Sequence, residues 1–138
     1  MKPALVDTSF LVAIYNKSDL YHERCVHVLD GLDQPLLTCE AVIAETCHLL
    51  RQVRGAAKTV LANIEEGNIE LPFQLSRSAD KVKTHIEKYR DTPADFADAC
   101  LIEMADEFDT GDILTLDSDF AHYRWRRNRA FHLLIPRG

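Results

Sequence analysis

Two acidic residues directly follow short apolar segments, where a purely structural role would favour an uncharged side chain. Asp7 ends the apolar run that begins at Ala4, and Asp117 follows residues 113–116. Both runs have the length and composition of buried strands. Because ligands bind beyond the carboxyl ends of the strands in open parallel sheets, we expect both carboxylates at the same edge of one sheet.

Two more acids interrupt helices whose neighbouring residues are apolar. Glu45 lies in a helix expected over residues 39–54 and Asp98 in one over residues 94–108. In both cases the residues one turn away are mostly apolar, which predicts a position on or beside the buried face. The other acids of the second helix are expected on its outer face: Glu103, Asp106 and Glu107.

Gathering four buried carboxylates costs several kcal/mol each unless protons or cations neutralise them. No lysine or arginine stands at a matching position, so a divalent cation explains the pattern better than raised pKa values with some acids protonated. Oxygen ligands favour Mg²⁺ or Mn²⁺, and the six histidines contain no H-x-x-x-H pair that would indicate zinc. Taken singly, each acid also has a structural interpretation: a helix cap for Asp7, helix-face charges for Glu45 and Asp98, and turn formation for Asp117 and Asp119.

The composition predicts one globular domain over residues 1–138. The chain is 46% hydrophobic and 28% charged, which is ordinary for a soluble protein. No apolar run approaches the roughly 20 residues of a membrane span, and the first residues do not have the pattern of a secretory signal, so we expect a cytoplasmic protein. The cysteines have no metal-binding spacing and are expected as small buried hydrophobes: Cys25, Cys39, Cys47 and Cys100.

Short apolar runs alternate with longer amphipathic ones, which predicts an α/β fold with a central parallel sheet of four to five strands and helices on both faces. The expected strands are residues 4–7, 36–38, 69–71, 112–116 and 131–135. The expected helices are residues 8–16, 19–29, 39–54, 56–66, 76–90 and 94–108. Thr8 or Ser9 would cap the first helix and Ser76 the fifth, and Pro93 suits the first turn of the last.

The formal charge of −6 is unusual for a nucleic-acid-binding protein, but the charge is unevenly distributed. The C-terminal segment holds Arg124, Arg126, Arg127, Arg129 and Arg137, with Tyr123 and Trp125 among them. Cations and an aromatic ring would suit single-stranded RNA, with Arg51, Arg54 and Lys58 extending the surface. The alternative is that Trp125 packs in the core and the arginines form a solvated face.

Four segments in this order resemble the PIN-domain proteins, and specifically the VapC-type toxins of prokaryotic toxin–antitoxin pairs. They are Leu-Val-Asp-Thr-Ser-Phe-Leu-Val-Ala from residue 5, the Glu45 helix, Asp-Phe-Ala-Asp-Ala from residue 95, and Leu-Thr-Leu-Asp-Ser-Asp-Phe from residue 114. The resemblance covers essentially the whole chain. It implies a ribonuclease that hydrolyses phosphodiester bonds at a Mg²⁺ or Mn²⁺ site formed by Asp7, Glu45, Asp98 and Asp117.

The resemblance leaves several roles open. Asp95 is a candidate additional ligand or water-mediated contact, and Asp119 could share the role of Asp117. Thr8 or Ser9 would orient the first acid, and Thr115 the last. His48 is either a structural helix residue or a substrate contact.

The resemblance also implies partners: RNA (single-stranded or structured, such as tRNA), a cognate antitoxin, and a second copy in a homodimer. The apolar stretches 11–14 and 60–61 could serve the core or an interface. A PIN fold that binds RNA or protein without cutting is the main alternative, and ordinary RNA processing stays open. A receiver-like signalling domain fits less well, because Asp7 stands alone after its strand and Asp117 precedes serine instead of a lysine-proline pair.

Overall fold

The computed structural model describes residues 2–92 and 94–136, and it contains a central four-stranded parallel sheet. The strands are β1 (Ala4–Val6), β2 (Leu36–Leu37), β3 (Asp112–Leu114) and β6 (His132–Leu133), in the order β2-β1-β3-β6. All three pairings are parallel, with Leu5 opposite both Leu37 and Ile113. Strand β1 is wholly buried, as its unbroken apolar sequence requires.

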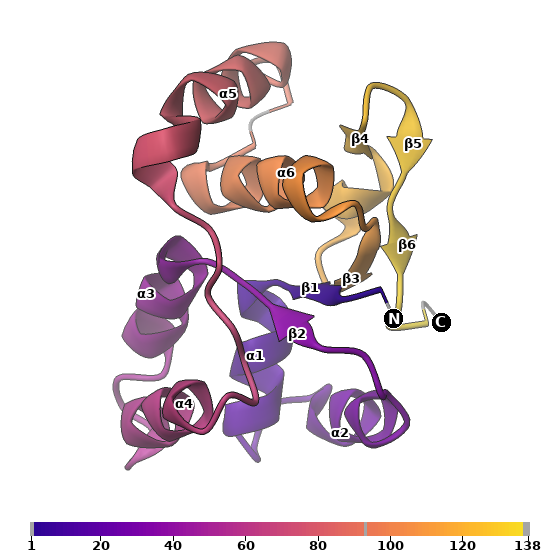
Figure 1. Cartoon of the computed structure of the whole chain (residues 1–138). Helices are drawn as coiled ribbons and strands as arrows, with labels where there is room; N and C mark the ends of the chain where they lie inside the picture. Colours follow the sequence, from indigo (N-terminus) through magenta and orange to yellow (C-terminus); the bar gives the residue numbers. More distant parts are fainter. Residues whose placement is uncertain (1, 93, 137–138) are drawn as a thin grey trace.

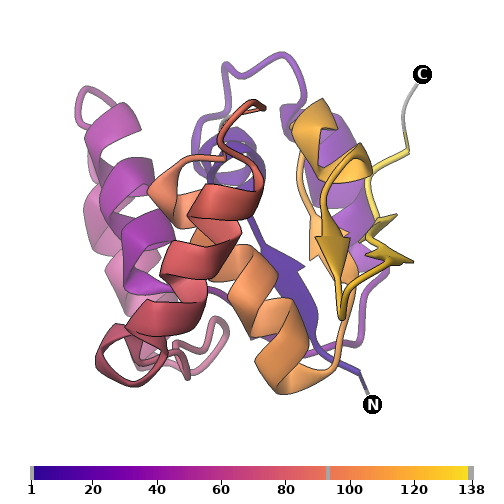
Figure 2. The ribbon, with the colours of Figure 1, turned by 90° about the horizontal axis from the view of Figure 1, so that it is seen from above.

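Helices cover both faces of this sheet, which confirms the predicted α/β class. They are α1 (Thr8–Tyr15), α2 (His22–Asp30), α3 (Glu40–Leu49), α4 (Ala56–Glu65), α5 (Leu75–Lys88) and α6 (Phe96–Phe108). Figure 1 shows α5 and α6 above the sheet and α1, α2 and α4 below it. Seen from above, α5 and α6 lie side by side (Figure 2).

The strands are shorter than the sequence predicts. The strand expected over residues 69–71 is only an isolated bridge between Leu37 and Glu70. A two-stranded antiparallel hairpin of β4 (Arg124–Trp125) and β5 (Arg129–Ala130) was not predicted, because two-residue strands are too short to show alternation.

Several helix ends also differ from expectation. Helix α1 is capped by Asp7 and not by Thr8 or Ser9, and α5 begins at Leu75, before the expected cap Ser76. Helix α3 ends at Leu49 instead of near residue 54. Helix α6 begins at Phe96 with Asp95 as its cap, and Pro93, expected in its first turn, lies outside the described residues.

Helix α2 begins at His22, three residues later than expected. The Asp19 carboxylate accepts the backbone N–H of Tyr21 at 2.8 Å and so forms a turn before the helix.

Helix α6 lies at the centre of the packing. Every residue from 97 to 105 is buried, because the sheet lies on one side of the helix and α5 on the other. The expectation that Glu103 faces outward is therefore wrong: it is 1% exposed beneath α5. Burial on both sides leaves no solvated face in the middle of this helix.

Trp125 is a packing residue. It is 5% exposed, and its indole N–H donates to the Ala130 carbonyl at 3.3 Å across the β4–β5 hairpin. Tyr123, two residues earlier, is fully buried. The prediction that these rings offer a base-stacking surface is wrong.

The four cysteines are free thiols, and Cys25, Cys39 and Cys100 are buried as predicted, whereas Cys47 is half-buried. Across residues 2–92 and 94–136, the helices are all too short or too polar to cross a membrane.

Replacing Gly111 should test how tightly Trp125 packs. A Cβ at Gly111 would lie 2.1 Å from the indole nitrogen of Trp125. Gly111→Ala is therefore expected to lower the free energy of unfolding by about 1–3 kcal/mol, measured by urea denaturation. Gly31→Ala is the control, because its nearest neighbour is 3.6 Å away; equal effects of the two changes would contradict this packing.

Candidate active site

Six acidic side chains from distant parts of the sequence line one open pocket of about 420 Å³. They are Asp7, Asp19, Glu45, Asp95, Asp98 and Asp117. Five of them were proposed from the sequence; Asp19 was not. The pocket opens beyond the carboxyl ends of β1 and β3, the edge where the sequence placed the first and last acids.

Asp7 is held firmly at the floor of the pocket. It is 5% exposed, and its Oδ1 accepts the Thr8 backbone N–H at 2.8 Å. Its Oδ2 accepts the hydroxyls of Thr115 at 2.6 Å and Ser9 at 3.3 Å. The expected orienting role of Ser9 thus matches the contacts, while Thr115 donates its hydroxyl to the first acid and not to the last.

Asp98 lies in the first turn of α6 and is 7% exposed. Its Oδ2 accepts the hydroxyl of buried Tyr123 at 3.1 Å, and its backbone N–H donates to the Asp95 carboxylate at 2.8 Å. Asp95 therefore combines two functions, because it caps α6 and also lines the pocket.

Asp117, and not Asp119, lines the pocket. The Asp117 carboxylate accepts the N–H of Asp119 at 2.9 Å, at the start of a short 3₁₀ turn (Ser118–Ala121). The Asp117 N–H in turn donates to the hydroxyl of Thr115. Thr115 is therefore the residue that joins both strand-end acids.

Glu45 reaches the pocket but is exposed, so of the predicted positions on or beside the buried face it does not take the first. The buried face of α3 carries Val42, Ile43 and Thr46, and Glu45 lies on the exposed side. Leu49, one of the three apolar neighbours behind the prediction, is 54% exposed and lines the same pocket. His48 is likewise exposed, and its ring lies 3.5 Å from the Arg51 guanidinium.

The buried acids carry an electrostatic cost. Burial, together with the Asp117 charge, raises the pKa of Asp7 to about 6. Burial and the charges of Asp95 and Asp7 raise the pKa of Asp98 to about 7. Both shifts show that the folded chain disfavours the ionised carboxylates.

The donor set fits a hard divalent cation. In the described part of the chain, no lysine or arginine lines this pocket. The buried hydroxyl oxygen of Thr8, which also lines it, has no hydrogen-bond partner there. Several carboxylates with no basic side chain among the described lining residues, beside a buried hydroxyl without a partner, offer the oxygen ligands that Mg²⁺ and Mn²⁺ prefer.

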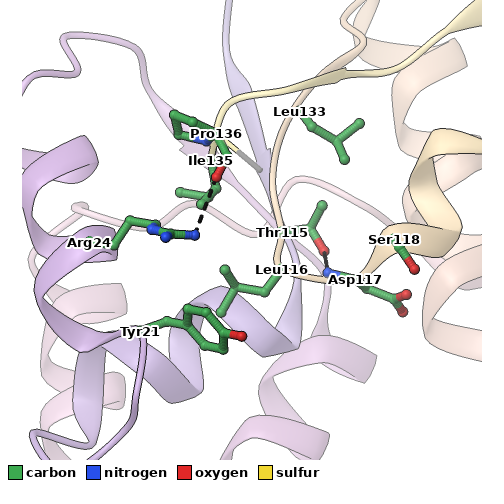
Figure 3. A pocket seen from close by; sticks show the side chains of 9 residues that line it. All are labelled: Tyr21, Arg24, Thr115, Leu116, Asp117, Ser118, Leu133, Ile135 and Pro136. Carbon is green, nitrogen blue, oxygen red and sulfur yellow. Dashed lines mark hydrogen bonds between the residues drawn. The ribbon is translucent and has the colours of Figure 1, made fainter. Parts of the chain in front are cut away.

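A second hollow of about 250 Å³ adjoins the acid pocket and shares Tyr21, Leu116 and Asp117 with it. Figure 3 shows Tyr21 and Arg24 on one side of this hollow and the segment from Thr115 to Ser118 on the other. The Arg24 guanidinium lies 5.6 Å from the centre of the Tyr21 ring and donates to the Pro136 carbonyl. An aromatic ring and a cation therefore border the acids.

The predicted basic surface lies elsewhere. The Arg126 guanidinium pairs with Asp109 at 3.3 Å and donates to the Asp106 carbonyl, which ties the hairpin to the C-terminal end of α6. Asp98 lies near the other end of that helix, about 12 Å away along its axis. Arg51, Arg54 and Lys58 are exposed, and none of the three lines the acid pocket. Arg137 lies outside the described residues.

Three residues that sequence reasoning missed contribute to the site. Asp19 and Tyr21 line the pocket from the turn before α2, and nothing in their spacing distinguishes them from ordinary turn residues. The Tyr123 hydroxyl donates a hydrogen bond to the Asp98 carboxylate. The polar residues around Tyr123 predicted an exposed ring. The ring is buried by tertiary packing, which the local sequence does not show.

A parallel sheet with acids beyond its carboxyl edge is consistent with a PIN-type domain, and the chain matches the PIN domain family over residues 4–126. The chain belongs to this family. It is 29% identical over 115 residues to ribonuclease VapC26 of Mycobacterium tuberculosis, covering 82% of this chain and 85% of that protein. These matches confirm the resemblance to the VapC-type proteins and exclude the receiver-like alternative.

The fold also matches the crystal structure of VapC20 of Mycobacterium tuberculosis, which is described as a toxin that cleaves the sarcin–ricin loop. The TM-score is 0.79 at 20% identity, with 86% of this chain and 93% of that chain covered. This similarity supports the arrangement of sheet and helices.

The raised pKa of Asp98 yields a stability prediction for the metal-free protein. Because the pKa is about 7 in the folded state and the reference value is 3.8, the folded state holds the proton more tightly. Stability should therefore fall as pH rises from about 4 to 7 and then level off. In EDTA at pH 8, Asp98→Asn is expected to raise the free energy of unfolding by about 1–3 kcal/mol, measured by urea denaturation.

The control for this measurement is Asp80→Asn, an exposed acid of α5. It should leave the dependence of stability on pH unchanged. An Asp98→Asn protein less stable than the parent at pH 8 would show that the ionised carboxylate is not a cost to the fold.

Proposed function

We propose that this protein is a metal-dependent endoribonuclease that hydrolyses RNA phosphodiester bonds, acting as the toxin of a toxin–antitoxin pair. The observation that carries the proposal is the convergence of Asp7, Glu45, Asp98 and Asp117 on one pocket that has no lysine or arginine among its described lining residues. The relative VapC26 is a ribonuclease by name, and VapC20 is described as cleaving an RNA loop. Both support the reaction class for this chain.

The proposed metal ligands are Asp7, Asp98 and Asp117, with Glu45 at the rim and Asp95 as an additional ligand or water-mediated contact. Bound Mg²⁺ or Mn²⁺ supplies Lewis-acid activation of water and neutralises charge on the phosphate. Asp119 has a positioning role, because its backbone N–H holds the Asp117 carboxylate while its own side chain lies outside the pocket lining.

The chain itself contributes orientation. Three donors fix the Asp7 carboxylate, and the Tyr123 hydroxyl fixes Asp98, so neither acid needs to reorganise when a cation and a phosphodiester arrive. Preorganised charge of this kind lowers the cost of reaching the transition state.

The RNA would bind in the hollow that adjoins the acid pocket and is lined by Tyr21 and Arg24. Tyr21 is 40% exposed and lies at the junction of the two spaces. A base stacked on this ring would place the neighbouring phosphate towards Asp117, and Arg24 would contact the backbone. The RNA would therefore run from the acid pocket towards α2 and not towards the β4–β5 hairpin.

The antitoxin and the homodimer are proposed from the same resemblance. The two apolar stretches are only partly buried. Leu11 and Val60 belong to the core, whereas Leu61 is 56% exposed. Leu49 and Tyr21 add apolar surface at the rim of the acid pocket, where an antitoxin segment would block access to the metal site.

Cleavage of RNA tests the central proposal. Purified protein with mixed RNA should cut in Mg²⁺ or Mn²⁺ and stop in EDTA. Asp7→Asn and Asp98→Asn should each lower the rate by about 100-fold or more, because each removes a charged ligand. Asp30→Asn, an exposed acid at the end of α2, should cut at the parent's rate.

Two outcomes would contradict the proposal. Cleavage that survives both aspartate substitutions would show a contaminating nuclease or a different site. Metal binding without cleavage of any RNA would favour the alternative of a catalytically silent PIN-fold binding module.

The path of the RNA is tested by binding. In the Asp98→Asn background, Tyr21→Ala is expected to raise the Kd for a short single-stranded RNA by about 5- to 100-fold, the usual effect of losing one stacked base. Tyr21→Phe keeps the ring and should bind like the parent, and Leu61→Ala should change nothing. Equal binding by Tyr21→Ala and Tyr21→Phe would exclude stacking on this residue.

A further inference from the structure

A histidine and two acids meet on the far side of α6 from the sheet, away from the acid pocket. His85 of α5 places its Nε2 3.1 Å from Oε1 of Glu103 and 3.5 Å from Oδ2 of Asp106, both on α6. One ligand atom from each of the three residues lies within 4.8 Å of the others. The sequence could not show this cluster, because His85 is 18 residues before Glu103.

The carboxylate of Glu103 is incompletely satisfied. The residue is 1% exposed, and its Oε2 has no hydrogen-bond partner in the described part of the chain. Burial and a hydrogen bond with the Glu107 carboxyl raise the pKa of Glu103 to about 7. Either a bound proton or a bound cation offsets the cost of this buried carboxylate.

The two separations from His85 Nε2 are close to the edge length of a metal coordination polyhedron. Zinc bonds to histidine nitrogen and carboxylate oxygen are about 2.0–2.2 Å long, so two ligands of a tetrahedral ion lie about 3.3–3.5 Å apart. The distances of 3.1 and 3.5 Å from His85 Nε2 bracket that separation. Three protein ligands would leave one position for water.

Neighbouring groups hold Asp106 and the adjacent Glu107 in place. The other oxygen of Asp106 accepts the backbone N–H of Arg126 at 2.6 Å, which leaves Oδ2 directed to His85. The carboxylate of Glu107, beside Glu103, accepts the Ser78 hydroxyl at 2.7 Å. Such outer contacts orient ligands in metal sites.

We propose that His85, Glu103 and Asp106 form a second metal site, selective for Zn²⁺ or a similar transition-metal ion and separate from the Mg²⁺ or Mn²⁺ pocket. Imidazole as a ligand distinguishes the two, because the acid pocket offers only oxygen. The ion has a structural role: it joins α5 to α6, the helix that carries Asp98. This inference does not depend on the proposed nuclease activity.

The alternative for the same contacts is a protonated His85 held between two carboxylates. In that arrangement a proton on the imidazole, and not a metal ion, holds the three side chains together. The two possibilities differ in one measurable respect, since only a metal site gains stability from added zinc.

The experiment uses the Asp7→Asn, Asp98→Asn double variant, so that zinc binding at the acid pocket is weakened. Calorimetric titration with Zn²⁺ should show one bound equivalent. Zinc at 100 times the Kd should raise the midpoint of thermal unfolding by about 10 °C. Co²⁺ in place of zinc should give the visible absorption of a tetrahedral N,O site.

Adding His85→Gln to this background should weaken zinc binding by at least about tenfold and remove the Co²⁺ absorption. Glu103→Gln, which keeps the shape of the side chain, should do the same, and it covers the case in which His85→Gln does not fold. His27→Gln, an exposed histidine of α2, is the matched control. No zinc equivalent in the double variant, or one that survives both cluster substitutions, would overturn the proposal.

Discussion

The hydrogen bond from the Thr115 hydroxyl to the Asp7 carboxylate is the interaction on which the acid pocket depends. It joins the ends of β1 and β3, and the same hydroxyl accepts the N–H of Asp117. Because Asp7 also caps α1, one buried carboxylate connects two strands and a helix. Burial and the Asp117 charge raise the pKa of Asp7 to about 6, so the ionised carboxylate costs the metal-free fold stability, which is the usual relation between a preorganised site and its scaffold.

The long helix α6 connects the two candidate metal sites. Its first turn presents Asp98 to the acid pocket, and its later turns present Glu103 and Asp106 to α5. Burial of residues 97–105 on both sides fixes the helix rigidly against the sheet. An ion held between α5 and α6 would therefore act on the same rigid element as the acids, although the two clusters share no residue.

Much of this architecture could be predicted from the sequence, because it rests on local patterns. Apolar runs that end in Asp7 and Asp117 predicted the strand edge, and the apolar neighbours of Asp98 predicted its burial. Glu45 was placed only on or beside the buried face, since helical periodicity cannot tell which of two apolar neighbours, Val42 or Leu49, reaches the core. Tyr123 and Glu103 were misplaced, and the role of Trp125 was left open between core packing and base stacking, for a related reason: their burial comes from α5 and the hairpin, whose packing leaves no local signal.

The spread of the pocket acids along the chain has a consequence for truncation of the protein. The acids come from positions 7, 45, 98 and 117, so the ribosome must complete most of the chain before the pocket can close. A stop codon anywhere before position 115 removes both Asp117 and the hydroxyl of Thr115 that holds Asp7. A single nonsense mutation late in the reading frame therefore removes two residues on which the acid pocket depends.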